Sequence, residues 1–497
     1  MKSIFENINL SSLADLFLYN PAEPLLFNTG LFLWLFIFFL LIYQAVRRYA
    51  TAKKIVTILF SLFFYYKSSA ECCFILLGIC LSDYLLARWL FATSGNTKRR
   101  FIVALNVVVN LGLLIYFKYF NLLLETAASI TGRDFDALDI ILPAGISFFT
   151  FRSISYIVDV YRGKLEPERN FLNYTFALTF FPPLLAGPVV RAVDILPQIR
   201  ENRPATRAMV SEGMVLIMCG LIKKVMIADY ISGNFVNRVF DNPMLYSGVE
   251  NLLAWFGFTL QLYCDFSGYS DMAIGLALLL GYRFNQNFNA PFKAQNPSEF
   301  WRRWHISLST WLRDYLYIPL GGNRCGKFRT YFNNIMTMVL GGLWHGSGWM
   351  YLLWGAYHGI LLAIHKAFKG VWNIPSAWIG KRPIRVANIF VTLCLVVFGF
   401  VFFRSPSLDS WSQMMQQVFT NFHADILPQF VAGYPMIVVA IIAGYAIHYI
   451  PTRYNQLVIN GYGKCPAIVQ GIILAIVLFL VIQARSSELV PFIYLSY

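Results

Sequence analysis

Apolar stretches close to the length of a membrane span recur along the chain from residue 31 to residue 482. The chain is 58% hydrophobic and only 13% charged, a composition not expected of a soluble globular protein of 497 residues. Within a bilayer, backbone polar groups must be paired inside the protein, so apolar segments of this length span as helices. We therefore expect an all-α polytopic membrane protein with roughly eleven transmembrane helices and further re-entrant or interfacial helices.

The basic residues indicate how the chain is oriented. The net charge is +15, but the basic residues are spread over many short loops, which disfavours nucleic-acid binding. Basic clusters at 47–54, 98–100, 162–169 and 366–385 alternate with the apolar stretches. Because positively charged loops remain in the cytosol, we predict that these four loops are cytosolic and that the N-terminus is periplasmic.

We expect residues 1–497 to form a single integral membrane domain, with residues 1–28 as an N-terminal interfacial segment. Two later segments break the alternation of spans. Residues 171–190 contain three prolines, which do not fit a regular spanning helix. Residues 306–320 begin and end next to basic loops. Both segments are predicted to be re-entrant or interfacial, since irregular backbone at membrane depth must be packed in protein or line a cavity.

Two further segments carry polar residues next to predicted spans. Asp265 and Asp271 follow the apolar stretch 252–263, and for them helix capping is favoured over a polar lining. Residues 405–431 form an outer segment in which apolar side chains recur at helical spacing. That amphipathic segment is either a docking surface for a partner protein or a helix lying in the outer leaflet.

Two histidines are candidates for chemistry. His345 lies between the apolar runs 335–343 and 349–354, and an ionisable group at membrane depth is a functional candidate. Four nearby glycines allow the backbone to approach another group closely. His305 follows the sequence Trp-Arg-Arg-Trp. The alternative, a hydrogen-bonded core histidine, stays open for both residues.

Familiar catalytic motifs are absent from the sequence. It contains no Walker loop, no GxSxG and no HExxH, and we expect no metal site. A histidine at depth suits acyl transfer, in which a neutral imidazole takes a proton from a hydroxyl while that hydroxyl attacks a thioester. A transporter with broken helices is the alternative from another class, although no inverted repeat is visible.

At these residues the sequence resembles the membrane-bound O-acyltransferase family, and within it the alginate O-acetyltransferase branch. The region from 100 to 405 carries the similar segments, which are 142–163, 181–191, 260–288, 300–324, 340–359 and 402–404. The resemblance implies a central tunnel among the helices. It implies that His345 is the catalytic histidine and that His305 faces the same tunnel. His358 has a counterpart in the family, without a settled role.

The resemblance also implies substrates, partners and a location. The donor substrate would be cytosolic acetyl-CoA, with no bound cofactor. The acceptor would be a hydroxyl on an exopolysaccharide such as alginate, or on a periplasmic, lipase-like acetyltransferase that completes the transfer. The protein would lie in the bacterial inner membrane. A related alternative is delivery of a D-alanyl group from a carrier protein to a teichoic acid.

Four residues close to His305 in the sequence are candidates for substrate binding, namely Arg303, Trp304, Arg313 and Asp314. The arginines are suited to a donor phosphate, but such charges also set topology. For Trp304 the role of an interfacial anchor is favoured, and for Asp314 an ion pair with Arg313 or another basic group is favoured. The remaining histidines are assigned no functional role; they are His365, His423 and His448.

Overall fold

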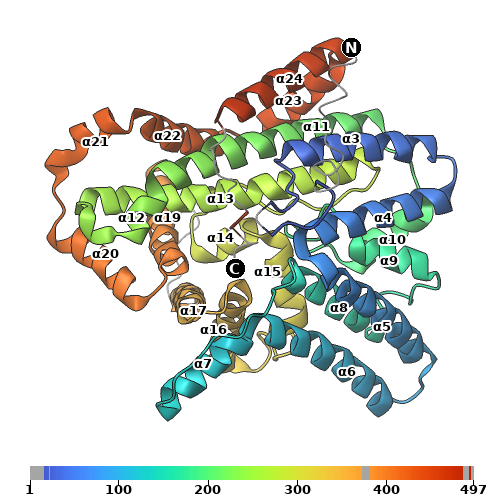
Figure 1. The fold of residues 1–497 in the computed structure, drawn as a ribbon. Helices are drawn as coiled ribbons and strands as arrows, with labels where there is room; N and C mark the ends of the chain where they lie inside the picture. Colours follow the sequence, from blue (N-terminus) through green and yellow to red (C-terminus); the bar gives the residue numbers. More distant parts are fainter. Residues whose placement is uncertain (1–15, 22, 372–380, 485–491, 494–497) are drawn as a thin grey trace. The chain divides into compact units, whose positions relative to one another are not determined.

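The structure is a computed structural model that describes residues 16–21, 23–371, 381–484 and 492–493. These residues form helices joined by turns and loops, and the described part of the chain contains no strand (Figure 1). The all-helical prediction is therefore confirmed.

The chain divides into two compact units, Met1–Pro204 and Ala205–Tyr497. The single domain expected over 1–497 stays a prediction. Most of the predicted interfacial segment lies outside the described residues, as do residues 372–380 of the predicted loop 366–385.

The described helices of the first unit run from residue 30 to residue 201. They are α3 (Gly30–Ala45), α4 (Ala50–Ser69), α5 (Cys73–Ala92), α6 (Asn96–Leu114), α7 (Phe120–Thr131), α8 (Ile146–Tyr161), α9 (Phe171–Thr179) and α10 (Ala192–Glu201). A π-helical turn at Ile115–Tyr119 joins α6 to α7.

Helix length and apolar composition support fewer spans than the sequence predicted. Four helical stretches of the described chain pass this test, namely Ala50–Ala92, Asn96–Thr131, Arg382–Arg404 and Ala467–Ala484. The pair Ala424–Gly433 and Pro435–Tyr449 is bent by 99° and adds a fifth if it is one span. The prediction of roughly eleven spans is not confirmed, because many of the helices are shorter or more polar than a full crossing requires.

A buried carboxylate ties four helices of the first unit together. Asp83 on α5 accepts hydrogen bonds from the hydroxyls of Tyr174 and Ser153, both at 2.7 Å, and from the Asn106 amide at 2.8 Å. These partners lie on α9, α8 and α6, and all four side chains are buried. Because a buried polar group is costly without partners, this cluster fixes how the four helices pack.

The proline-containing segment 171–190 is irregular where the sequence predicted it. Helix α9 ends at Thr179, before the Pro182–Pro183 pair, and residues 180–190 are all buried. Phe181 packs against the aromatic rings of α3 and α4, and its backbone N–H donates to the Ser61 hydroxyl at 3.1 Å. This non-helical backbone is packed in protein, as irregular backbone in a membrane protein must be unless it lines a cavity.

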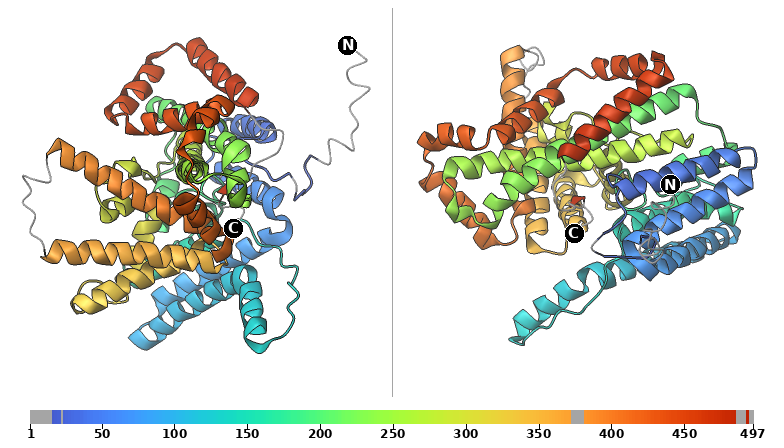
Figure 2. Two further views of the ribbon diagram at one scale, coloured as in Figure 1. Left: turned by 90° about the vertical axis from the view of Figure 1, so that its left-hand side faces the viewer. Right: turned by 45° about the horizontal axis from the view of Figure 1, so that its top comes forward.

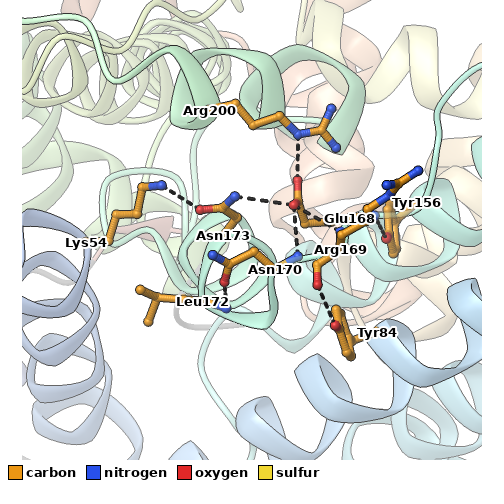
Figure 3. A network of polar contacts seen from close by, with 9 residues as sticks. All are labelled: Lys54, Tyr84, Tyr156, Glu168, Arg169, Asn170, Leu172, Asn173 and Arg200. Carbon is orange, nitrogen blue, oxygen red and sulfur yellow. Dashed lines mark hydrogen bonds and ion pairs between the residues drawn. The ribbon is translucent and has the colours of Figure 1, made fainter. Parts of the chain in front are cut away.

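Glu168, which lies just before this segment, contacts Arg200, which lies ten residues after it (Figure 3). The Glu168 carboxylate accepts from the Arg200 guanidinium of α10 at 2.7 Å and from the backbone N–H groups of Arg169 and Asn170. Burial alone would raise the pKa of Glu168, but the Asn170 N–H and Arg200 together hold it below its usual value. The stretches on either side of the segment therefore contact each other at Glu168 and Arg200, and the re-entrant path stays a prediction.

The second unit carries the remaining helices. They are α11 (Arg207–Leu221), α12 (Asn237–Asp241), α13 (Gly248–Leu279), α14 (Pro297–Arg303), α15 (Ile306–Leu312), α16 (Gly326–His345), α17 (Trp349–Val371), α19 (Arg382–Arg404), α20 (Leu408–Thr420), α21 (Leu427–Gly433), α22 (Pro435–Tyr449), α23 (Arg453–Lys464) and α24 (Ala467–Ala484). Helices α11 and α13 run side by side (Figure 2). A Cβ on Gly220 would lie 2.6 Å from the Gly268 carbonyl oxygen, so glycine allows this close approach.

The helix-capping role favoured for Asp265 and Asp271 is wrong. Helix α13 begins with a capping box formed by Ser247 and Glu250 and continues without a break through both aspartates. Asp265 pairs with Lys224, which also pairs with Asp229 at 2.8 Å, and Asp271 pairs with Lys223 at 2.6 Å. Neither aspartate caps a helix, because both lie within α13. Each carboxylate is neutralised by a lysine from the π-helical segment Ile222–Asp229.

The amphipathic helix predicted within 405–431 is present as α20. Its Met414 is fully buried, and the Trp411 ring stacks on the Phe402 ring of α19 with centroids 4.9 Å apart. These apolar residues pack within the second unit, whereas Leu408 and Phe419 of the same helix are 55% and 75% exposed.

Candidate active site

The candidate site is built on the hairpin of α16 and α17. Helix α16 ends at His345, and α17 begins at Trp349 after a short turn. A Cβ on Gly342 would lie 2.2 Å from the Tyr351 carbonyl oxygen, and one on Gly355 would lie 2.4 Å from the Met338 carbonyl oxygen. The close backbone approach expected from the glycines is therefore confirmed, and the group approached is the neighbouring helix.

His345 is enclosed by aromatic side chains. It is 4% exposed, and its ring centroid lies 4.9 Å from that of Trp344, 5.0 Å from that of Trp354 and 5.3 Å from that of Phe403. Trp354 comes from α17 and Phe403 from α19, so three helices form the enclosure. Such a lining excludes water, which would otherwise compete with the acceptor for a reactive acyl group.

His305 lies in a strained turn between α14 and α15. Its φ is +41°, a left-handed conformation that costs a non-glycine residue about 1–3 kcal/mol. The turn is held by the Ile306 N–H, which donates to the Asn287 carbonyl oxygen at 2.8 Å. Backbone strain held in place by surrounding contacts is a feature of functional sites.

Asn287 also fixes the His305 ring. The Nδ1–H of His305 donates to Asn287 Oδ1 at 3.3 Å, and the Ser307 hydroxyl donates to the same oxygen at 2.8 Å. The Asn287 amide in turn donates to the Ser270 hydroxyl at 3.0 Å. His305 is fully buried and lies outside the candidate spans, and burial lowers its pKa to about 3. The ring is therefore neutral near pH 7, with the lone pair on Nε2.

Trp344 connects the two predicted histidines. Its ring centroid lies 6.0 Å from that of His305 and 4.9 Å from that of His345. On the other side of His305, the Phe266 ring of α13 lies at 4.7 Å. The structure thus brings His345 and His305 into one aromatic cluster, with an indole between them.

A third histidine belongs to the same cluster. His358 on α17 is 1% exposed, and its ring centroid lies 5.0 Å from that of Trp354 and 5.2 Å from that of Trp301. A Cβ on Gly399 would lie 2.7 Å from His358 Nε2, so this glycine allows α19 to pass close to the ring. The aromatic cluster therefore continues from His345 through Trp354 to His358.

Two of the predicted substrate-binding residues, Arg303 and Arg313, form ion pairs with carboxylates of this chain. Arg303 pairs with Glu299 at 2.8 Å and donates to the Asn289 carbonyl oxygen at 3.0 Å. Arg313 pairs with Asp314 at 2.7 Å, which confirms the ion pair expected for Asp314.

Trp304 lies among other aromatic rings and not at a surface. It is 1% exposed, with the rings of Phe288 and Phe400 both at 5.1 Å. Its interpretation as an interfacial anchor is wrong, because an anchor must reach the membrane–water boundary.

Sequence reasoning missed Asn287. It follows the long helix α13 in a polar loop containing three asparagines within residues 285–289, and that composition indicated only a turn. No local pattern marks which asparagine faces a histidine 18 residues later. Among the residues that the structure describes, no group of three or more His, Cys, Asp or Glu could hold a metal ion.

His448, for which no function was expected, has a structural role. It is buried, and its Nε2 accepts a hydrogen bond from the Phe292 N–H at 3.1 Å. Its ring also packs on that of Tyr263 at 4.7 Å. His448 is therefore a hydrogen-bonded core histidine, the role that the sequence left open as the alternative for His305 and His345.

Comparison with known proteins agrees with this geometry. A model of the membrane-bound O-acyltransferase family, MBOAT, matches residues 169–405. The chain is 42% identical to the probable alginate O-acetylase AlgI of Pseudomonas aeruginosa over 402 residues, covering 79% of this chain and 74% of that protein. It is 35% identical to the peptidoglycan O-acetyltransferase of Helicobacter pylori over 425 residues, covering 78% of each.

A more distant relative carries a different acyl group. The chain is 30% identical to the teichoic acid D-alanyltransferase of Bacillus subtilis over 274 residues, covering 52% of this chain and 68% of that protein. All three names describe acyl transfer, and the matched region contains His305, His345 and His358. The chain therefore belongs to the membrane-bound O-acyltransferase family, and it is a multi-pass membrane O-acyltransferase.

Proposed function

We propose that this O-acyltransferase moves an acetyl group from cytosolic acetyl-CoA to a hydroxyl presented on the outer side of the bacterial inner membrane. The observation that carries the proposal is His345, a buried histidine enclosed by Trp344, Trp354 and Phe403. Two relatives that match 79% and 78% of this chain are named for O-acetyl transfer, which favours acetyl over other acyl groups.

In the proposed mechanism His345 acts as the general base. Its neutral imidazole takes the proton of the acceptor hydroxyl as the oxygen attacks the thioester carbonyl. The new ester C–O bond forms and the C–S bond breaks. The proton then passes from the imidazolium to the departing thiolate, which restores the neutral ring. No covalent intermediate on the protein is required.

His305 has a supporting role in this mechanism. The hydrogen bond from its Nδ1 to Asn287 leaves Nε2 as an acceptor, so the ring can receive a hydrogen bond from a substrate group. Orienting a substrate contributes less, and less predictably, than transferring its proton. We therefore assign His345 the catalytic role and His305 an orienting one.

The proposed acceptor is an exopolysaccharide such as alginate, or a periplasmic, lipase-like acetyltransferase that relays the group to the polymer. The alginate and peptidoglycan names of the relatives support a polysaccharide acceptor. The orientation that presents the acceptor side outward is the one predicted from the basic loops, with a periplasmic N-terminus. D-alanyl transfer is the second candidate, supported by the teichoic acid relative over about half of the chain.

The test measures transfer from labelled acetyl-CoA in membranes that contain equal amounts of each variant. His345→Ala should lower the rate by a factor of about 10²–10⁴, the usual contribution of a general base. His305→Ala should lower it less. His423→Ala is the control, because His423 is 57% exposed and pairs with Asp425 away from the cluster.

Two outcomes would contradict the proposal. Wild-type turnover in correctly inserted His345→Ala would exclude the mechanism. Transfer from a D-alanyl carrier protein, with none from acetyl-CoA, would replace the acetyl proposal with the D-alanyl one.

A further inference from the structure

A pocket of about 300 Å³ lies between α14, α16 and α17. It is lined by Asn296, Ser298, Arg302, Asn334, Leu362, His365 and Lys366. Two of these side chains are cations, one is apolar, the others are hydrogen-bonding groups, and none is acidic. A lining of this kind is suited to an anion that accepts several hydrogen bonds.

Among the described residues the two cations of the pocket have no carboxylate partner, unlike Arg303 and Arg313. Arg303 and Arg313 are each neutralised by a carboxylate, Glu299 and Asp314. Arg302 is exposed and forms no ion pair within the described residues. The Lys366 ammonium donates to the uncharged Asn323 side chain at 2.6 Å, which leaves its charge uncompensated. The pocket therefore holds positive charge that no carboxylate among the described residues neutralises.

The pocket is connected to the histidine cluster through two helices. On α14, Trp301 packs on the His358 ring, and the next residue, Arg302, lines the pocket. On α17, Trp354 contacts His345, and Lys366 lies about 18 Å further along the helix at about 1.5 Å per residue. A donor that reacts at His345 and reaches Lys366 along this helix therefore needs an extended arm.

We infer that this pocket binds a phosphate at the far end of the pantetheine arm of the acyl donor. The inference rests on the proposed function, because it takes the thioester to react at His345. A pantetheine arm is long, linear and flexible, and it separates a thioester from a phosphate in both CoA and a carrier protein. Arg302 and Lys366 provide the charge, and His365, to which the sequence assigned no role, adds a ring at the pocket wall.

The test compares four acetyl donors with the purified full-length enzyme. They are acetyl-CoA, acetyl-dephospho-CoA, acetyl-4′-phosphopantetheine and acetyl-pantetheine. Arg302→Ala and Lys366→Ala should each raise KM for the phosphate-bearing donors by about tenfold or more, the effect of losing one charged hydrogen bond. KM for acetyl-pantetheine should be high in the wild type and unchanged in the variants.

Control variants separate charge from folding. Arg302→Lys should recover part of the lost donor affinity. Arg385→Ala removes an exposed arginine from the predicted cytosolic side and outside the pocket, and it should leave all four KM values unchanged. If KM for acetyl-4′-phosphopantetheine rises in the alanine variants as much as KM for acetyl-CoA, the pocket binds the phosphate of the pantetheine arm itself. An effect that requires acetyl-CoA identifies the nucleotide phosphates.

Direct binding distinguishes failure of this inference from failure of the proposed function. Adenosine 3′,5′-bisphosphate and 4′-phosphopantetheine are titrated into the detergent-solubilised enzyme without any turnover. Loss of binding of either compound in both alanine variants supports the pocket, even if wild-type enzyme transfers nothing from acetyl-CoA. Equal binding of both compounds by wild type and variants, or an equal KM change for all four donors, overturns the inference.

Discussion

Gly342→Ala tests whether the close contact of α16 with α17 positions the catalytic cluster. The added Cβ would lie 2.2 Å from the Tyr351 carbonyl oxygen and 3.1 Å from the Gly355 Cα. Both are backbone atoms, so no side-chain rotation relieves the overlap. Alanine in a helix gains about 1 kcal/mol over glycine, whereas overpacking costs up to about 3 kcal/mol. We expect a net destabilisation of about 2 kcal/mol.

The same change should affect activity. Separating the two helices moves Trp354 relative to His345, whose rings are now 5.0 Å apart. A misplacement of about 1 Å in a catalytic group can lower the rate by about 10²-fold. We expect activity to fall by about 10- to 100-fold at equal protein levels.

Gly348→Ala is the matched control. Its Cβ would lie 3.6 Å from the nearest Tyr351 ring atom, an ordinary contact, so stability should change by less than about 0.5 kcal/mol. The assay combines thermal unfolding of the purified protein in detergent with acetyl transfer in membranes. If Gly342→Ala matches Gly348→Ala in both measurements, the reasoning is refuted.

Three further predictions concern other parts of the molecule. Asn287→Ala leaves the Ser307 N–H without its acceptor and releases the His305 ring. We therefore expect a loss of about 1–3 kcal/mol in unfolding free energy and a lower rate of acetyl transfer. Ser270→Ala removes only the hydrogen bond that the Asn287 amide donates, so it should lower stability and transfer less. Glu168 has a lowered folded-state pKa, so its contribution to stability is complete above its usual value of about 4.5 and is lost as the pH falls through the folded value. Glu168→Gln should therefore lower stability at pH 7 and flatten the acid side of the stability curve, and an unchanged curve from pH 3 to 7 would contradict this. A single cysteine at position 98 on a cysteine-free background should resist a membrane-impermeant maleimide in intact cells, and strong labelling would place the loop 98–100 outside.

Much of the architecture could be predicted from local sequence. Apolar stretches and prolines act through the neighbouring backbone, so they indicated the helices, the irregular segment after Thr179 and the two apolar runs on either side of His345. The same local signal misled where two elements meet. From the sequence alone Asp265 resembles a capping residue, but in the structure it pairs with Lys224. The sequence also contains more apolar stretches than the described chain has helices long enough to span a membrane.

The sequence by itself therefore determined the class of fold, the family motifs and the identity of His345 and His305 as candidates. Only the tertiary structure decided which polar groups face each other. It paired Asn287 with His305, neutralised Arg303 and Arg313 with carboxylates, and left Arg302 and Lys366 in a shared pocket. The physical reason is that helix formation depends on residues within a few positions of one another, whereas the partner and charge environment of a side chain depend on helices brought together by packing.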